Sequence, residues 1–314
     1  FGKTMGGNSS GWWTLMGFEN EPVEWSSGDF STYSIQYCRF QNLRFINGQN
    51  LGVGRADWIS PMPPPSHHIE IRNNLFNGSQ PRYGYIEVKF EDSLVEGNTI
   101  VCTGGGQTTD HGIYLHHGAR NTIRGNTISG TVGYGVHVYD ERKGSGDPQT
   151  FFIDVVIENN VLFGSRNRSG LIISQGGDTQ VKSVIVRNNI TWGNAGAGID
   201  LTNYGSQVMQ GIKVINNTVT DRMFAGKATI VGSEIRNNIA LGGISIPSGA
   251  GVVQANNMLA GDPRFVSLIE RNYHLLSTSP CRGQGITMES APVDRDGVVR
   301  PVPACDQGAY QFVG

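Results

Sequence analysis

Histidine and tyrosine, side chains suited to proton transfer near neutral pH, are concentrated in one part of this chain. Four of its seven histidines fall between residues 111 and 137, and the short segments around them also carry Tyr114 and Tyr139. Histidine titrates close to neutral pH, and a neighbouring cation acidifies a tyrosine phenol. These residue types suit general acid–base catalysis or sugar binding. A polar face that serves solubility alone is the alternative interpretation.

Alternating apolar residues indicate which of these side chains share a surface. In Gly112-Ile113-Tyr114-Leu115-His116, a strand that buries Ile113 and Leu115 must turn Tyr114 and His116 outward. Similar segments occur one repeat before and after it, and adjacent strands of a sheet lie ~4.8 Å apart. We therefore expect two columns of outward side chains on one sheet. The first is Glu87, Tyr114, His137, Ile172 and Asp200, and the second is Lys89, His116, Tyr139, Ser174 and Thr202, with His117, Asp140, Gln175 and Asn203 at the strand ends.

The elements that position these columns are marked by a repeated phrase that ends in asparagine. Its first copy is Ile71-Arg72-Asn73-Asn74, and the closing asparagine recurs at positions 98, 126, 160, 189, 217, 238 and 257. Regular recurrence at this spacing indicates a repeat architecture. Two or three short strands per repeat, with no helical segment between them, indicate an all-β solenoid. Asparagine amides one repeat apart can stack into a ladder, so we expect these asparagines to be structural.

The Ile-x-Asn-Asn-x-Ile/Val and Gly-Ile/Val-x-Val/Leu phrases resemble those of the right-handed parallel β-helix proteins of the pectate-lyase-like superfamily. The resemblance covers residues 35–260 and implies an all-β, right-handed parallel β-helix there. Residues 1–34 would then form an N-terminal cap or partial first coil. Residues 261–314, which include Asp262-Pro263-Arg264-Phe265, resemble the closing segment of many secreted bacterial β-helix proteins, which packs over the last coil. Such a cap is needed because an open solenoid end exposes unpaired backbone groups.

The outward residues resemble the His, Tyr, Lys and Arg centres of β-helix alginate lyases and mannuronan C5-epimerases. The resemblance implies an enzyme that removes the C5 proton of a uronic acid in an extracellular polysaccharide. Such a reaction needs a group that neutralises the carboxylate, together with a base and an acid. The candidates are Lys89, His116 and His137 for neutralisation and Tyr114 or Tyr139 for proton transfer. The candidate substrate-binding residues are Glu87, His117, Asp140, Arg142 and Asp200.

Two other functions stay open on the sequence. A glycoside hydrolase needs two carboxylates ~5 to ~9.5 Å apart. Glu87 and Asp200 are separated by four repeats and are too distant, whereas Asp140 and Asp200 are separated by two repeats, roughly 10 Å, which is marginal. The other possibility is a non-catalytic carbohydrate-binding, adhesin-like or surface-layer module, in which Trp192 and Tyr204 could stack on sugars.

Composition argues against other partners. A net charge of −2 with 16% charged residues provides no basic face for nucleic acid, and no apolar run approaches the ~18 residues of a membrane span. No cofactor or metal is predicted, although calcium at Asp294-Arg295-Asp296-Gly297 or a transition metal at the clustered histidines is a minor alternative. Cys281 and Cys305 could form a disulfide, in keeping with an extracellular or periplasmic location. The abrupt start at Phe1 suggests a mature or trimmed product.

Overall fold

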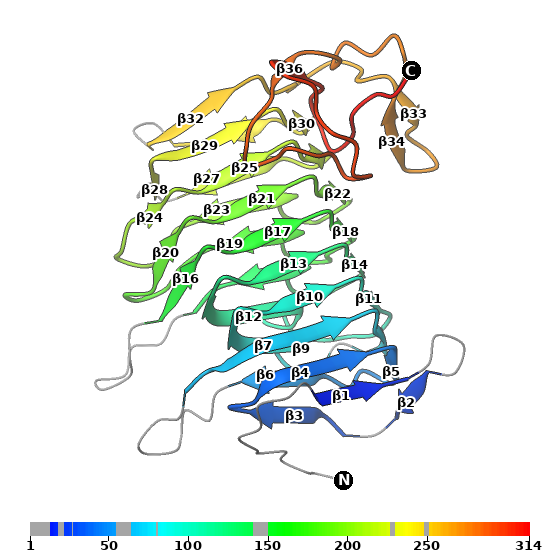
Figure 1. The fold of residues 1–314 in the computed structure, drawn as a ribbon, viewed down its shortest axis with the longest axis vertical. Helices are drawn as coiled ribbons and strands as arrows, with labels where there is room; N and C mark the ends of the chain where they lie inside the picture. The colour runs from blue at the N-terminus through cyan, green and yellow to red at the C-terminus, as the bar shows by residue number, and fades with distance from the viewer. Residues whose placement is uncertain are drawn as a thin grey trace.

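The chain folds into a parallel β-helix, whose strands lie one above another from coil to coil (Figure 1). The computed structural model describes residues 13–17, 22–26, 28–54, 64–79, 81–140, 150–226, 230–247 and 251–314. Strands and turns account for these residues, and the described part contains no helix long and apolar enough to cross a membrane. The predicted all-β solenoid is confirmed.

The coils place their strands in four parallel stacks, of which the first three join in a 23-stranded sheet and the fourth is a nine-stranded sheet. Stack 1 comprises β3 (Phe30–Tyr33), β6 (Leu51–Gly54), β9 (Gly84–Glu91), β12 (His111–Ala119), β15 (Val136–Val138), β19 (Leu171–Ile173), β23 (Ile199–Thr202), β27 (Met223–Gly226) and β31 (Ile244–Ser245). Stack 2 comprises β1 (Trp13–Met16), β4 (Gln36–Gln41), β7 (Ser66–Arg72), β10 (Leu94–Glu96), β13 (Thr122–Arg124), β17 (Val156–Glu158), β21 (Ile185–Arg187), β25 (Lys213–Ile215), β29 (Ser233–Arg236) and β32 (Val252–Ala255).

The two remaining stacks complete the coils, stack 3 with four strands and stack 4 with nine. Stack 3 comprises β16 (Phe151–Ile153), β20 (Gln180–Lys182), β24 (Met209–Gln210) and β28 (Ile230–Val231). Stack 4 comprises β2 (Val23–Trp25), β5 (Leu43–Phe45), β8 (Leu75–Gly78), β11 (Thr99–Cys102), β14 (Thr127–Ser129), β18 (Val161–Phe163), β22 (Ile190–Trp192), β26 (Thr218–Val219) and β30 (Ile239–Ala240). Two antiparallel pairs follow in the C-terminal segment: β33 (Phe265–Ser267) with β34 (Asn272–Leu275), and β35 (Gly285–Ile286) with β36 (Ala304–Cys305).

The apolar half of each alternating segment fills the interior of the solenoid. Ile113, Leu115, Val136 and Val138 have no exposed surface and belong to one core that runs through the coils. Burial of each such side chain contributes roughly 1.5–3 kcal/mol to stability. Because these residues are fixed inward, the residues between them are held on the outside of stack 1.

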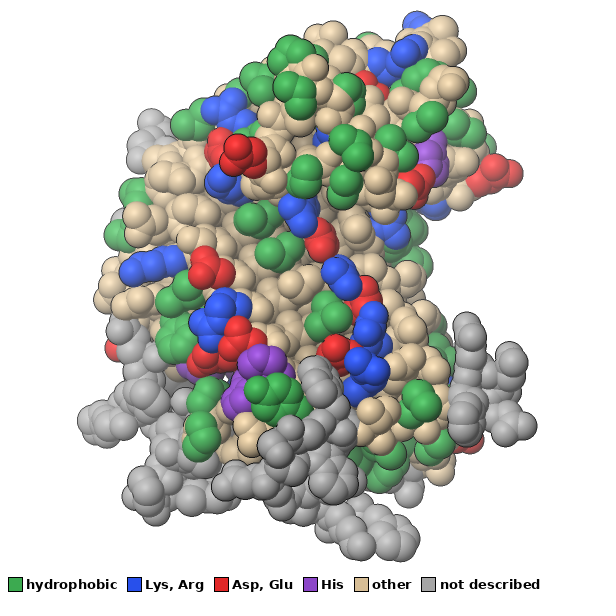
Figure 2. Space-filling model, in the orientation of Figure 1, with side chains coloured by type: hydrophobic (Ala, Val, Ile, Leu, Met, Phe, Trp, Pro, Cys, Tyr) green, Lys and Arg blue, Asp and Glu red, His purple; other side chains and the backbone are tan. Residues whose placement is uncertain are grey.

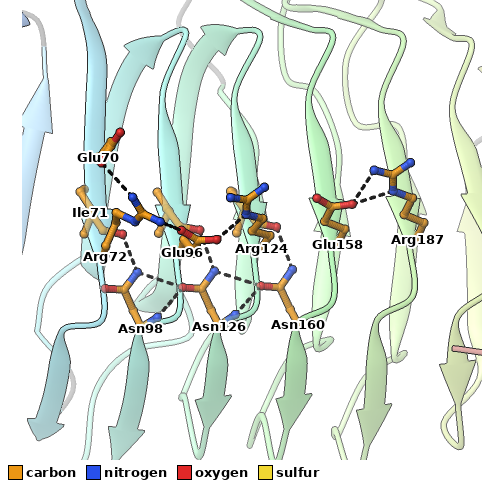
Figure 3. Close-up of polar contacts among 12 residues, drawn as sticks. Glu70, Ile71, Arg72, Glu96, Asn98, Arg124, Asn126, Glu158, Asn160 and Arg187 are labelled. Atoms are coloured by element: carbon orange, nitrogen blue, oxygen red, sulfur yellow. Dashed lines mark hydrogen bonds and ion pairs between the residues drawn. The ribbon is translucent and has the colours of Figure 1, made fainter. Parts of the chain in front are cut away.

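The repeated asparagine phrase forms the corner between stacks 2 and 4, and its two asparagines have different roles. The first position of the pair adopts a left-handed backbone, with φ of 53° at Asn73 and 65° at Gly125, a conformation that asparagine and glycine tolerate. The second asparagine points inward, where each side-chain amide donates to the side-chain oxygen of the next copy, as from Asn98 to Asn126 at 2.9 Å and from Asn126 to Asn160 at 3.0 Å (Figure 3). The predicted ladder is confirmed.

The outer face of stack 2 carries a second ladder, made of ion pairs. Arg72 contacts Glu70 and Glu96, Arg124 contacts Glu96, and Arg187 contacts Glu158, at distances of 2.5 to 3.2 Å (Figure 3). Acidic and basic side chains accordingly lie next to one another along the molecule (Figure 2). Partly exposed pairs of this kind each contribute little to stability. These guanidinium groups are thus already paired with carboxylates.

The C-terminal segment lies at the end of the solenoid opposite β1, β2 and β3 (Figure 1). It was expected to pack over the last coil, but it reaches further along the side of the helix. Its backbone accepts a hydrogen bond from Asn188, through Val293, and Arg295 donates to the carbonyl of Asn159. The first residue of each corner pair, which has the left-handed backbone, can turn its side chain outward. Successive copies of the phrase therefore provide a row of side-chain amides to which the C-terminal segment binds.

The possible disulfide between Cys281 and Cys305 is not formed, and that expectation was wrong. Both thiols are free and buried. The sulfur of Cys281 lies 2.9 Å from that of Met258, whereas Cys305 packs beside Asn237. Burial raises the pKa of both thiols, which keeps them protonated and unreactive.

Candidate functional site

The first predicted column of outward residues is present on stack 1. The strand register places Glu87 opposite Tyr114, Tyr114 opposite His137, His137 opposite Ile172 and Ile172 opposite Asp200. Alternation sufficed for this column because the register is regular at these positions, so a face assigned in one coil holds in the next.

The second predicted column is broken by a β-bulge in β12. The register shifts between Leu115 and His117, so that Lys89 lies opposite His117 rather than His116. The prediction that pairs Lys89 with His116 was therefore wrong, because a bulge places two residues opposite one. His117 is buried at this bulge, with its ring 4.5 Å from that of Phe151.

Aromatic rings and imidazoles pack closely around His137. The ring of Tyr114 is stacked between His116 and His137, with centroid distances of 3.5 and 4.6 Å. His137 also lies 4.1 Å from His111, 4.7 Å from Tyr134 and 5.2 Å from Tyr139. Two neighbouring coils contribute to this cluster, those of β12 and β15, so its contacts to His137 form only when these coils stack.

Burial keeps the clustered histidines neutral. It lowers the pKa of His111 to about 3, with the charges of His116 and Arg168 adding to the effect. Burial also lowers the pKa of His137 well below 6.5, followed by the charges of His111 and His116. The Nδ1 atom of His111 accepts a hydrogen bond from the backbone N–H of Tyr134 at 3.0 Å, as a neutral ring can. The clustered imidazoles are therefore unprotonated at neutral pH.

His116 and Glu87 form a pair beside Tyr114. The Nε2 atom of His116 lies 2.9 Å from Oε1 of Glu87. Burial alone would raise the pKa of Glu87, but the hydrogen bond and charge of His116 outweigh it and the pKa is lowered. Burial outweighs the carboxylate for His116, whose pKa is lowered. The contact with Glu87 holds the imidazole of His116 against the ring of Tyr114.

A groove passes over the cluster along the direction in which the coils stack. It consists of two hollows of about 370 and 360 Å³ that share Tyr134, Arg168 and Tyr204. The first hollow is bordered by His111, His137 and Tyr139, and the second by Asp200, Thr202, Arg222 and Phe224. His137 and Tyr139 from the coil of β15 and Asp200 from the coil of β23 are thus brought to one groove. A groove lined by aromatic and polar side chains is a typical ligand site.

Sequence reasoning missed Tyr134, Arg168 and Arg222, and it named Tyr204 only as a residue that could stack on sugars in a binding module. These residues lie in turns next to the strands, where no alternation assigns a direction. Their position just before or after a stack 1 strand was a weak indication of a role in binding. Turns at the strand ends of a solenoid border any ligand that binds on the sheet. Arg168 lies over the ring of Tyr134 at 5.9 Å, and Tyr204 meets Tyr139 edge to face at 6.5 Å.

Asp200 is held inside the second hollow. Its Oδ2 atom accepts a hydrogen bond from the hydroxyl of Ser169 at 3.2 Å, and Oδ1 accepts one from Thr202. Burial raises its pKa, although these two hydrogen bonds and the charges of Arg222 and Arg168 oppose the rise. Among the described residues that border the groove, Asp200 supplies the single carboxylate.

Residues 28–219, more than half of the chain, match the family described as the right-handed β-helix region. The chain belongs to this right-handed β-helix family. No curated protein sequence matches it.

Three solved structures with a similar fold are distant in sequence from this β-helix protein. It is 13% identical to pectate lyase Pel9A, with 96% of this chain and 87% of that chain covered and a TM-score of 0.41. It is 12% identical to PfbA, a surface adhesin of Streptococcus pneumoniae, with 74% and 60% covered and a TM-score of 0.46. It is 12% identical to XylC in a complex with xylose, with 91% and 67% covered and a TM-score of 0.45. Likenesses this remote assign no activity.

The other predicted site residues of the β-helix protein lie outside the groove lining. Glu87, His116 and Tyr114 form the layer next to His137, and Lys89 is displaced by the bulge. Asp140 is buried at the end of β15, where its backbone carbonyl accepts a hydrogen bond from Gly176. Arg142 lies outside the described residues. Trp192 is stacked on Phe163, lies 5.8 Å from the ring of Tyr273 in the C-terminal segment, and does not border the groove.

The proposed calcium loop does not fit a metal. The carboxylate of Asp294 accepts hydrogen bonds from the backbone N–H groups of Asp296, Val298 and Gln311 at 2.7 to 2.8 Å, which is the pattern of a polar turn. Within the described ranges, no group of three or more His, Cys, Asp or Glu side chains is arranged to hold a metal ion.

Proposed function

We propose that this β-helix protein is a carbohydrate-active enzyme that removes the C5 proton of a uronic acid unit in an extracellular polysaccharide, as a lyase or an epimerase. Secretion to an extracellular or periplasmic location belongs to the same proposal. The observation that carries it is the first hollow of the groove, where a guanidinium that is paired with no described carboxylate lies together with a neutral imidazole and tyrosine phenols.

Arg168 takes the role of neutralising the uronate carboxylate. Its guanidinium has no hydrogen bond or ion pair to any described residue, and it is braced over the ring of Tyr134. A fixed cation at the carboxylate stabilises the negative charge that develops when the neighbouring C5 proton leaves. The histidines cannot supply this charge because burial keeps them neutral.

His137 takes the role of the base and Tyr139 that of the acid. The Nδ1 atom of His137 is buried without a hydrogen-bond partner among the described residues, so no neighbour fixes its tautomer. The ring of Tyr139 lies nearly parallel to that of His137, at an interplanar angle of 12°. A phenol beside an imidazole can return a proton to the substrate after the imidazole has removed one.

The groove supports hydrolysis less well. A glycoside hydrolase of either stereochemical type employs a pair of carboxylates. Asp200 is the single carboxylate among the described groove residues, and both of its oxygens accept hydrogen bonds from hydroxyl groups. A partner for Asp200 in acid–base catalysis is therefore missing from the described groove.

The test is incubation of the purified protein with alginate, pectate and glycosaminoglycans. A lyase produces an unsaturated uronate that absorbs in the ultraviolet, and an epimerase exchanges the C5 hydrogen for deuterium in heavy water. Arg168→Ala and His137→Ala should each lower the rate by about a hundredfold or more. The matched control is Arg44→Ala, which removes an exposed arginine from β5 on the other sheet.

The possible outcomes separate the candidate functions. Release of reducing ends without ultraviolet absorbance would favour hydrolysis. Binding of a uronan without cleavage or exchange would favour a carbohydrate-binding module. An Arg168→Ala variant as active as Arg44→Ala would refute the role of Arg168.

A further inference from the structure

The half of the groove beyond Arg168 holds a second arginine with the same properties. Arg222 borders the second hollow together with Arg168, and its guanidinium lies 5.6 Å from the ring of Phe224. Each of these two arginines is therefore braced against an aromatic ring, which fixes its position without neutralising its charge.

Neither guanidinium is paired with a described residue, in contrast to the arginines on the outer face of stack 2. There Arg72, Arg124 and Arg187 each contact a glutamate. A charge left unpaired in a concave site is available for an anionic ligand, and the fork of a guanidinium matches a carboxylate. Two such charges thus line one groove.

Asp200 lies between the two arginines but is not bonded to either of them. It follows Ile172 and precedes Phe224 in the outward column of stack 1. The hydroxyls of Ser169 and Thr202 hold its carboxylate in place. The charges along the groove therefore alternate, with the positive Arg168, the negative Asp200 and the positive Arg222 in that order. The carboxylate between the two arginines can accept a hydrogen bond from a sugar hydroxyl.

The spacing along the groove suits a chain rather than a single sugar. Arg168 precedes β19 and Arg222 precedes β27, two coils further on, and two coil spacings amount to ~10 Å. We infer that Arg222 and Asp200 form a second subsite. This subsite binds another acidic sugar of the same polysaccharide chain, whose reacting unit lies at Arg168. This inference rests on the proposed function and specifies its substrate as an oligosaccharide with acid groups on more than one unit.

The inference is tested by calorimetric binding of uronides of increasing length. Substrate turnover is removed by making all measurements in the full chain with His137→Gln. In that background Arg222→Ala should weaken the binding of longer oligouronides by roughly ten- to hundredfold. It should leave the binding of a monouronide unchanged. Arg222→Lys should restore part of the affinity, and Arg44→Ala should have no effect.

The outcomes distinguish this inference from the proposed reaction. Arg222-dependent binding without cleavage or exchange by the wild-type protein supports the second subsite and refutes the lyase or epimerase. Cleavage that depends on Arg168, with oligouronide affinity unaffected by Arg222→Ala, refutes the second subsite alone. An equal loss of affinity for the monouronide and the longer chains also refutes it, because a second subsite cannot contact a single sugar held at Arg168.

Discussion

The asparagine ladder should contribute several kcal/mol at each interior position, and Asn126→Ala is the sharpest test. The Asn126 amide donates to the carbonyl of Val95 and to the side chain of Asn160, both at 3.0 Å. Its side-chain oxygen accepts from the backbone and the side-chain amide of Asn98, both at 2.9 Å. At ~1 kcal/mol for each of four hydrogen bonds, the substitution should lower the free energy of unfolding by about 4 kcal/mol.

Position in the ladder should change this cost. Asn257, at the C-terminal end, donates to Ile235 and accepts two bonds from Asn238, and it is partly exposed. Asn257→Ala should therefore cost about 1–2 kcal/mol, since water can replace part of what is lost. Asn126→Asp should cost more than Asn126→Ala, because it places a buried charge opposite two acceptor oxygens.

Urea unfolding, followed by the loss of β signal in circular dichroism, measures these differences. The control is Asn77→Ala, whose exposed side chain lies in β8, two coils before Asn126, and should change stability by less than about 0.5 kcal/mol. Hydrogen exchange at the backbone amide of Asn98 should accelerate in Asn126→Ala, because that amide loses its acceptor. Equal stability of Asn126→Ala and Asn77→Ala would refute the energetic role of the ladder.

Two further predictions concern buried ionisable groups. Folding lowers the pKa of His111 from 6.5 to about 3. Between these two pH values the unfolded chain binds a proton that the folded chain does not. The free energy of unfolding therefore falls as the pH drops below 6.5. The loss of stability amounts to about 2 kcal/mol by about pH 5. His111→Asn should flatten the slope of unfolding free energy against pH. An unchanged slope would contradict the lowered pKa of His111. Arg300→Met should destabilise the C-terminal segment by about 3 kcal/mol, since buried Arg300 donates to Asn188 and to the carbonyl of Gly308, each at 3.0 Å. Limited proteolysis should cleave this variant faster than the exposed control Arg264→Met, and equal resistance would count against it.

Much of the fold could be predicted because the structural repeat corresponds to a repeat in the amino-acid sequence. The interval between copies of the Asn phrase indicated coils, and alternation within the segments assigned Glu87, Tyr114, His137 and Asp200 to one face. Both predictions depend on interactions between equivalent positions of neighbouring coils. The reach of the C-terminal segment along the corner asparagines was missed, because nothing in its own residues indicates where it packs.

The candidate site could be predicted in part. Alternation placed His137 and Asp200 correctly, but the bulge after Leu115 displaced Lys89, and no residue type marks a bulge in advance. The histidines were expected to supply positive charge, whereas burial leaves them neutral, and the cation at the groove is Arg168 from a turn. The direction of a turn depends on packing between coils, which periodicity does not encode.

The sequence by itself determined the solenoid, its corner asparagines and the outward column of stack 1, because each follows from local alternation repeated at a regular interval. The tertiary structure alone decided which groups meet in the groove and how they are charged. The groove joins residues from turns of several coils, and the protonation of His111 and His137 depends on how completely the stacked coils exclude water from them.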